Sequence, residues 1–363
     1  MIVRLGRAAA LAGLLVIPNP VWPNPVWPDP VWAADTPAAD EGQALDVRRL
    51  SPEQHRRLVA GDTIAYRVLE TSDTELGAGV AMYVPVSLGR AADALTSPEV
   101  VLREPSITAS GPVAAGATAA ALDGFTFLPG EISEAQDALD AAPGSRLNLA
   151  LPEIEAFRAI KGRLRGADRA AVLEAAASQW RTLLLQRGQA FQARGLDGVA
   201  PYARRSGVSE PAALLRVAAA DSRIVAHVAP RLADSLLRYP AEQSPTAISR
   251  FYWVKRLVQG RPTPILIHHL VDVSPAMALY VERHIYVGHT YNASQILSAA
   301  VPYEDGVLIL SSNRVSTDQV AGLGGEMKRM IGRRQLRAEI VKRFDRIRAA
   351  LAAPAPPERV ESP

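Results

Sequence analysis

The chain has 363 residues, 48% of them hydrophobic, and a formal net charge of +3 at pH 7. A charge this close to zero gives no general electrostatic support for binding nucleic acid, and the hydrophobic content is sufficient for a large core. The sequence contains no cysteine, which excludes thiol catalysis, thiolate zinc sites and a cysteine-linked lipid anchor.

Residues 1–33 have the layout of a secretory signal peptide. Two arginines precede an apolar run at 8–17, and a small-residue cleavage pattern follows at 31–33. Three tandem proline-rich pentapeptides occupy 18–32, and their prolines disfavour both helix and sheet pairing. Because a membrane span needs about 20 apolar residues, the short run favours a cleaved peptide over an anchor. We therefore expect export to the periplasm or beyond the cell, with residues 34–50 as a flexible lead-in.

The first predicted section, residues 51–150, mixes helices and strands. Ser51 followed by Pro52 is typical of a capped helix start. The other expected elements are strands at 63–70 and 80–86, a helix near 91–95 and a short strand at 125–128. The pair Pro143-Gly144 predicts a turn that closes the section.

Residues 151–245 are predicted to form an all-helical insertion. Within it, apolar residues recur every three to four positions at Ile154, Phe157, Ile160 and Leu164. This spacing is typical of one face of a helix, and comparable spacing continues to about residue 236. Two prolines then end the helical pattern.

The third section, residues 246–352, is predicted to contain antiparallel strands followed by a long helix. The stretch 263–273 is apolar at odd and even positions, as in a strand that is covered on both faces. The further expected elements are strands at 280–291 and 307–315, a helix at about 325–352 and a disordered tail at 353–363. The buried stripe of that helix is predicted to be Leu336, Ile340, Phe344, Ile347 and Leu351.

Together the three sections predict an α+β fold, in which a curved antiparallel sheet grips a long C-terminal helix and carries an all-helical insertion. This order of elements resembles the START-like helix-grip fold, whose sheet wraps the last helix and leaves a cavity between them. The likeness concerns the fold, and a fold by itself does not establish function.

Short motifs in the last section carry a second resemblance. They are Phe251-Tyr252-Trp253-Val254-Lys255, Arg261-Pro262-Thr263, His268 and Tyr286-Val287-Gly288-His289. With these motifs the chain, from about 125 to 351, resembles a group of exported bacterial proteins that has no established activity. Members of the group carry a cysteine on each side of the Pro-Gly turn. This chain has Ala141 and Arg146 there, so the disulfide that the resemblance implies cannot form.

A ligand site is predicted from the histidines and aromatic residues of the expected strands. A strand bulge would bring His289 to the face of Tyr286, and together with His268 they would bind a ligand headgroup inside the cavity. Trp253 and Lys255 would line its mouth, where apolar surface meets one positive charge. Alternatively, the histidines are hydrogen-bonded core residues and the aromatic segment is a hydrophobic anchor. No carboxylate stands at a suitable spacing for a metal site, so neither a metal nor a cofactor is predicted.

The last helix carries a basic face. The residues predicted to contact a membrane surface are Arg333, Arg334, Arg337, Lys342 and Arg343. Attraction to anionic phospholipid is worth about 1 kcal/mol for each basic residue close to the surface. The alternative interpretation is that these residues form the solvated side of an amphipathic helix.

Common catalytic patterns are missing from the sequence, which has no Gly-x-Ser-x-Gly elbow, no phosphate-binding loop and no His-Glu-x-x-His. The leading hypothesis is therefore an exported protein that binds a hydrophobic or amphiphilic, lipid-like small molecule in the sheet–helix cavity. The alternative is a non-enzymatic cell-envelope protein that docks through its helical section and basic last helix. A third hypothesis, a hydrolase or cyclase, would rest on His268, Tyr286 and His289.

Overall fold

The structure is a computed structural model that describes residues 50–97, 102, 104–144, 146–220, 230–241, 244–321 and 324–352. The predicted signal peptide, the tail, and all of the lead-in except its last residue lie outside these residues. Within the described part of the chain, no helix is both long enough and apolar enough to cross a membrane.

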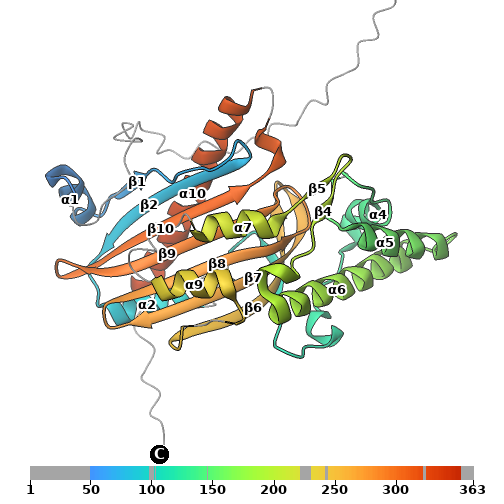
Figure 1. The fold of residues 1–363 in the computed structure, drawn as a ribbon, viewed down its shortest axis with the longest axis horizontal. Helices are drawn as coiled ribbons and strands as arrows, with labels where there is room; N and C mark the ends of the chain where they lie inside the picture. The colour runs from blue at the N-terminus through green and yellow to red at the C-terminus, as the bar shows by residue number, and fades with distance from the viewer. Residues whose placement is uncertain are drawn as a thin grey trace, which may run out of the picture. The chain divides into compact units, whose positions relative to one another are not determined.

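A curved antiparallel sheet of eight strands forms the centre of the described structure (Figure 1). Its strands are β1 (Thr63–Tyr66), β2 (Glu75–Val84), β3 (Ile107–Pro112), β6 (Ala247–Val258), β7 (Arg261–Ser274), β8 (Met277–Val287), β9 (Ala293–Tyr303) and β10 (Gly306–Ser316). Their order in space is β1-β2-β10-β9-β8-β7-β6-β3, and the sheet does not close into a barrel. Strands β6 to β10 therefore form one meander, to which the early strands are added at both edges.

Tight turns set the register of this meander. β6 and β7 are joined by Gln259 and Gly260, whose φ angles are 53° and 76°. Two consecutive positive φ angles are typical of a type I′ turn, which matches the twist of an antiparallel pair. The turn fixes Val258 opposite Arg261, and the pairing then continues to Ala247 opposite Asp272.

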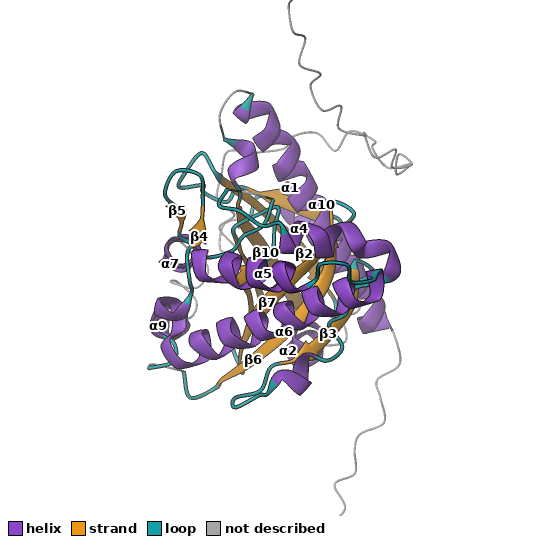
Figure 2. Cartoon of the chain, turned by 90° about the vertical axis from the view of Figure 1, so that its right-hand side faces the viewer, coloured by secondary structure: helices purple, strands orange, loops and turns teal. Residues whose placement is uncertain are grey.

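Helices cover both faces of the sheet (Figures 1 and 2). They are α1 (Pro52–Val59), α2 (Leu88–Thr96), α4 (Ile132–Leu139), α5 (Leu151–Arg163), α6 (Arg169–Arg194), α7 (Pro211–Ala220), α9 (Pro230–Arg238) and α10 (Gly325–Ala352). Apolar side chains of α2 and α10 share one core with β2 and β10. On the other face, α7 and α9 pack on β7 to β9, and α4 to α6 pack against β6 to β8.

The predicted fold class is confirmed: the chain is α+β, with a curved antiparallel sheet and a C-terminal helix. The last helix spans 325–352 as predicted, and Ile340, Phe344, Ile347 and Leu351 are buried while Leu336 is half-buried. The first helix begins after Ser51, whose side chain accepts a hydrogen bond from the backbone N–H of Gln54.

Other predicted elements were wrong or missed. The segment 125–128 is not a strand, although Phe125 and Phe127 are buried, because its carbonyls accept from the Lys255 and Arg181 side chains rather than from a neighbouring strand. The strand predicted at 280–291 ends earlier, because β8 stops at Val287. Strands β3, β6 and β9 were not predicted individually, nor was a small hairpin, β4 (Tyr202–Ala203) and β5 (Val208–Ser209), inside the section predicted to be all-helical.

Candidate functional site

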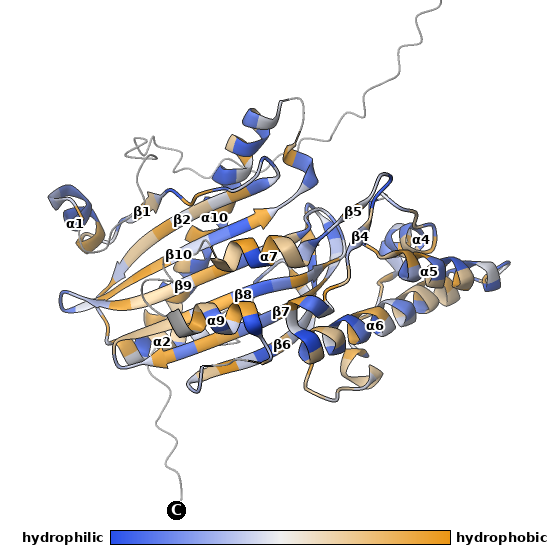
Figure 3. Ribbon diagram, in the orientation of Figure 1, coloured by the Kyte–Doolittle hydropathy of each residue, from blue (hydrophilic) through white to orange (hydrophobic). Residues whose placement is uncertain are grey.

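Two rows of buried polar residues lie on opposite faces of the sheet. Because side chains alternate along a strand, neighbouring residues of β7 and β8 point to opposite sides. His269 and Glu282 are cross-strand partners on the α10 side, whereas His268 and Arg283 are partners on the α7 and α9 side. Figure 3 shows the corresponding hydrophilic stretches within otherwise hydrophobic strands.

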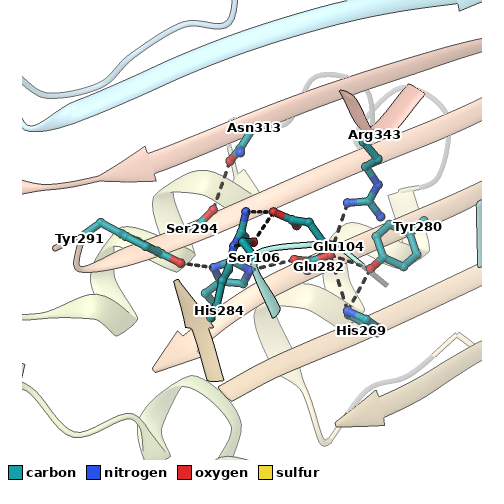
Figure 4. Close-up of polar contacts among 11 residues, drawn as sticks. Glu104, Ser106, His269, Tyr280, Glu282, His284, Tyr291, Ser294, Asn313 and Arg343 are labelled. Atoms are coloured by element: carbon teal, nitrogen blue, oxygen red, sulfur yellow. Dashed lines mark hydrogen bonds and ion pairs between the residues drawn. The ribbon is translucent and has the colours of Figure 1, made fainter. Parts of the chain in front are cut away.

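The Glu282 carboxylate is the centre of the row that faces α10 (Figure 4). Its Oε1 accepts from His284 Nε2 at 2.8 Å, and its Oε2 accepts from the Tyr280 hydroxyl at 2.8 Å. The Arg343 guanidinium, which comes from α10, donates to Oε2 through Nη1 at 3.3 Å. The same guanidinium lies over the Tyr280 ring, 4.6 Å from its centroid. A negative charge buried between two strands is thus paired with a cation from the last helix.

Hydrogen bonds extend this centre in both directions. His284 Nδ1 lies 2.8 Å from the Tyr291 hydroxyl, and the Tyr280 hydroxyl lies 2.9 Å from His269 Nε2. One set of proton positions satisfies every contact. Tyr291 donates to His284, His284 and Tyr280 both donate to Glu282, and His269 donates to Tyr280. The row is therefore a continuous chain of hydrogen bonds, running from His269 to Tyr291.

The electrostatics of the row favour an ionised glutamate beside neutral imidazole. Burial raises the pKa of the Glu282 carboxyl, but contacts with His269 and His284 and the charge of Arg343 outweigh it, so the pKa lies well below its usual range. Burial lowers the pKa of His269. Between β8 and α10, where an apolar cavity was predicted, these side chains form a charged network instead.

An open pocket of about 490 Å³ lies at the β3 edge of the sheet, where β3 stops and the first residues of β6 are paired with β7 alone. The pocket is lined by 112–115, Gln192, Tyr239 and 249–252. Aromatic rings stand at its base. The His268 ring stacks on Phe251, with centroids 4.6 Å apart and planes 7° apart, and lies 4.9 Å from the Tyr239 ring.

Polar groups of the pocket are few and specifically placed. Ser249 Oγ lies 2.8 Å from His268 Nε2, and Gln192 donates to the Val113 carbonyl at 2.8 Å. Burial, followed by the charge of Arg283, lowers the pKa of His268 well below its usual value, so this imidazole is neutral. The Arg250 side chain is half-buried, points to the face of β6 opposite to Ser249 and Phe251, and has no hydrogen bond or ion pair with the residues that the structure describes. The pocket therefore combines aromatic surface with one unpaired cation.

Trp253 and Lys255, the predicted mouth of the ligand site, lie outside this pocket. Trp253 is buried, and its Nε1 donates to the Ala121 carbonyl at 2.9 Å. The buried Lys255 ammonium donates to the Thr126 carbonyl and to the Glu131 carboxylate, both at 2.8 Å. Both side chains tie residues 121–131 to β6, which favours the interpretation of this segment as an anchor.

Tyr286 and His289 lie in separate surroundings. Tyr286 packs against Trp180 and under the Arg187 guanidinium, which is 4.4 Å from the ring centroid. His289 Nε2 lies 2.9 Å from Thr263 Oγ1. Among the described residues, no hydrogen bond or ring contact joins His268, Tyr286 and His289 to one another, and the only bulge in the β7–β8 pairing lies between Leu266 and Ile267. None of the three lines the pocket, but His268 lies behind its wall, in contact with Ser249 and Phe251.

The predicted basic face of α10 requires one correction. Arg343 is buried against Glu282 and cannot belong to a solvent-exposed face, because it lies on the same side of the helix as Ile340 and Ile347. Arg333 is paired with Glu70, and Lys342 is paired with a glutamate one turn away. Of the other two residues of the predicted set, Arg334 is exposed and Arg337 is half-buried.

Sequence reasoning missed the Glu282 network, although a pattern for it was present. Tyr280, Glu282 and His284 stand at alternate positions of an apolar strand, which indicates one polar face. The described residues include no group of three or more His, Asp or Glu side chains able to hold a metal ion. Comparison of the chain with models of protein families, with curated proteins and with solved structures finds no match.

Proposed function

We propose that the protein binds a small amphiphilic molecule with an anionic group, in the pocket at the free end of β6. The observation that carries this proposal is the pairing of aromatic surface with the unpaired guanidinium of Arg250 in a pocket of about 490 Å³. Pockets of roughly 300–1,000 Å³ with apolar walls and a few polar groups are typical of small-molecule sites. The binding mode is the one expected from the sequence, but at the sheet edge rather than under the last helix.

Each part of the pocket has a separate role in this proposal. The rings of Tyr239 and Phe251 offer apolar surface to the hydrocarbon or ring part of the ligand. The hydroxyl of Ser249 lies on the same face of β6 as Phe251 and offers hydrogen bonding, and Arg250 lines the pocket from the other face of the strand and offers charge to the anionic group. A neutral His268 below Ser249 adds no second charge, so selectivity for an anion depends on Arg250.

Calorimetric titration with decanoate and with decanol, which share one hydrocarbon chain, tests the proposal. Arg250→Met is expected to weaken decanoate binding by about tenfold or more, the loss typical of one charged hydrogen bond, and to leave decanol binding within about twofold. Arg158→Met, which removes an exposed arginine from α5, is the matched control and should change neither affinity.

Two results would count against the proposal. If decanoate does not bind saturably to the wild-type protein, anionic amphiphiles are ruled out as the ligand class. Equal weakening of decanoate and decanol by Arg250→Met removes the role assigned to the cation.

A further inference from the structure

Several arginines of this protein use the same edge of the guanidinium to hold a carboxylate. In each of these pairs Nε and Nη2 donate in parallel to the two oxygens of one glutamate, at 2.6 to 3.1 Å. The pairs are Arg187–Glu153, Arg261–Glu134, Arg314–Glu75 and Arg333–Glu70. Two parallel donors match the spacing of two carboxylate oxygens, so this edge is selective for planar oxyanions.

Arg343 presents the same edge without a partner. Its Nη1 reaches Glu282 and its guanidinium lies on the Tyr280 ring, so two contacts fix the orientation of the group. Its Nε and Nη2 are buried and have no hydrogen-bond partner, and only 9% of the side chain is exposed. Buried donors that are left unpaired destabilise the folded state, and the cost is larger for a charged group.

A second guanidinium stands one turn further along α10. Arg346 Nε is also buried and has no hydrogen-bond partner. Burial, opposed in part by the charge of Glu104, lowers the pKa of Arg346. Glu104 is itself paired with Arg256, and Glu282 with Arg343, so Arg346 is the cation in excess among these groups.

We propose that Arg343 and Arg346 form a binding site for a carboxylate group, held by Nε and Nη2 of Arg343 and by Nε of Arg346. A single negative charge matches the one cation in excess, whereas a doubly charged oxyanion would repel the nearby Glu282 carboxylate. This site lies on the α10 side of the sheet and does not depend on the pocket beside His268, which faces the opposite side.

Acetate, which has almost no apolar surface, is the appropriate probe. The arginine Nε–H resonances of the full chain, labelled with nitrogen-15, are followed by NMR while acetate replaces chloride at constant ionic strength. We expect saturable shifts of two buried Nε–H signals, one of which is absent in Arg343→Lys. That variant keeps the charge opposite Glu282 but lacks the paired donors, so acetate binding should weaken about tenfold or more.

Controls separate this site from the rest of the molecule. Arg334→Lys, at an exposed position of the same helix, and Arg250→Met, in the β6 pocket, should leave the acetate shifts unchanged. If Arg343→Lys does not fold, Arg346→Lys provides the second test and should weaken the saturable shift. The proposal is overturned if no buried Nε–H signal shifts with acetate, if chloride causes the same shifts, or if phosphate binds more tightly than acetate.

Discussion

His289 occupies a site where its ring cannot readily carry a charge. The ring is buried, and its Nε2 contacts Thr263 Oγ1 and the Pro262 carbonyl, which lie in the first residues of β7. Burial, followed by the charge of Arg261, lowers the pKa of His289 to about 4. In the unfolded chain a histidine titrates near its ordinary pKa of about 6.5. Between these two values the unfolded state binds more protons than the folded state.

The stability of the protein should therefore fall as the pH is lowered from about 6.5 to about 4. The contribution of His289 is fully present above the unfolded pKa and is lost through this range, by up to about 3 kcal/mol. We expect His289→Gln to reduce this pH dependence, measured by urea unfolding at several pH values. His55→Gln, at a more exposed histidine on α1, is the control and should follow the wild-type curve. A wild-type pH dependence in His289→Gln would contradict the prediction.

At the scale of single elements, the residue spacing in α10 predicts which side of the helix is buried but not which residues that side contacts. The apolar spacing predicted its bounds and its buried stripe correctly. The same spacing places Arg343 three residues after Ile340 and four before Ile347, on the stripe itself, so its burial could have been predicted. The partner of Arg343 could not have been predicted, because Glu282 is 61 residues away along the chain and meets Arg343 only after the sheet has formed.

A buried and an exposed position of α10 should respond differently to truncation. Phe344 is fully buried against β2 and β10, so Phe344→Ala should lower the free energy of unfolding by about 3–5 kcal/mol. Met330, near the start of the same helix, is 61% exposed, and Met330→Ala should change the free energy of unfolding by less than about 0.5 kcal/mol. Chemical unfolding of both variants checks the difference, and equal losses would contradict the burial of Phe344 and the exposure of Met330.

At the scale of the whole molecule, the structure places helices on both faces of the sheet, as was predicted for the strand at 263–273, although only the last helix was named as a covering element. The apolar residues at both odd and even positions of 263–273 correctly indicated that this strand is covered on both faces. The helical section supplies part of the second layer, and beside it residues 121–131 are held to β6 by Trp253 and Lys255. These residues were assigned to a ligand because their local pattern, large aromatics beside one cation, is shared by anchors and binding sites.

Membrane docking through α10 also belongs to this scale and stays a prediction. With Arg343 buried, the exposed Arg334 is the member of the predicted basic set best placed to meet a membrane. We expect weak flotation with vesicles that contain phosphatidylglycerol, lost at about 0.5 M salt because exposed charges are then screened. Arg334→Gln should reduce flotation, and Arg158→Gln on α5 should not. Binding that is insensitive to salt, or equal binding to neutral vesicles, would rule out this electrostatic mode.

The sequence by itself determined the α+β class, the long last helix and most strands of the meander, because periodicity and turn residues act over a few neighbouring positions. Only the tertiary structure decided which buried polar groups became partners. His269 meets Glu282 through strand register, and Arg343 reaches the same carboxylate from a helix packed across the sheet. Such pairings depend on contacts between distant segments, and the free energy of a buried charge depends on those contacts rather than on its neighbours in the chain.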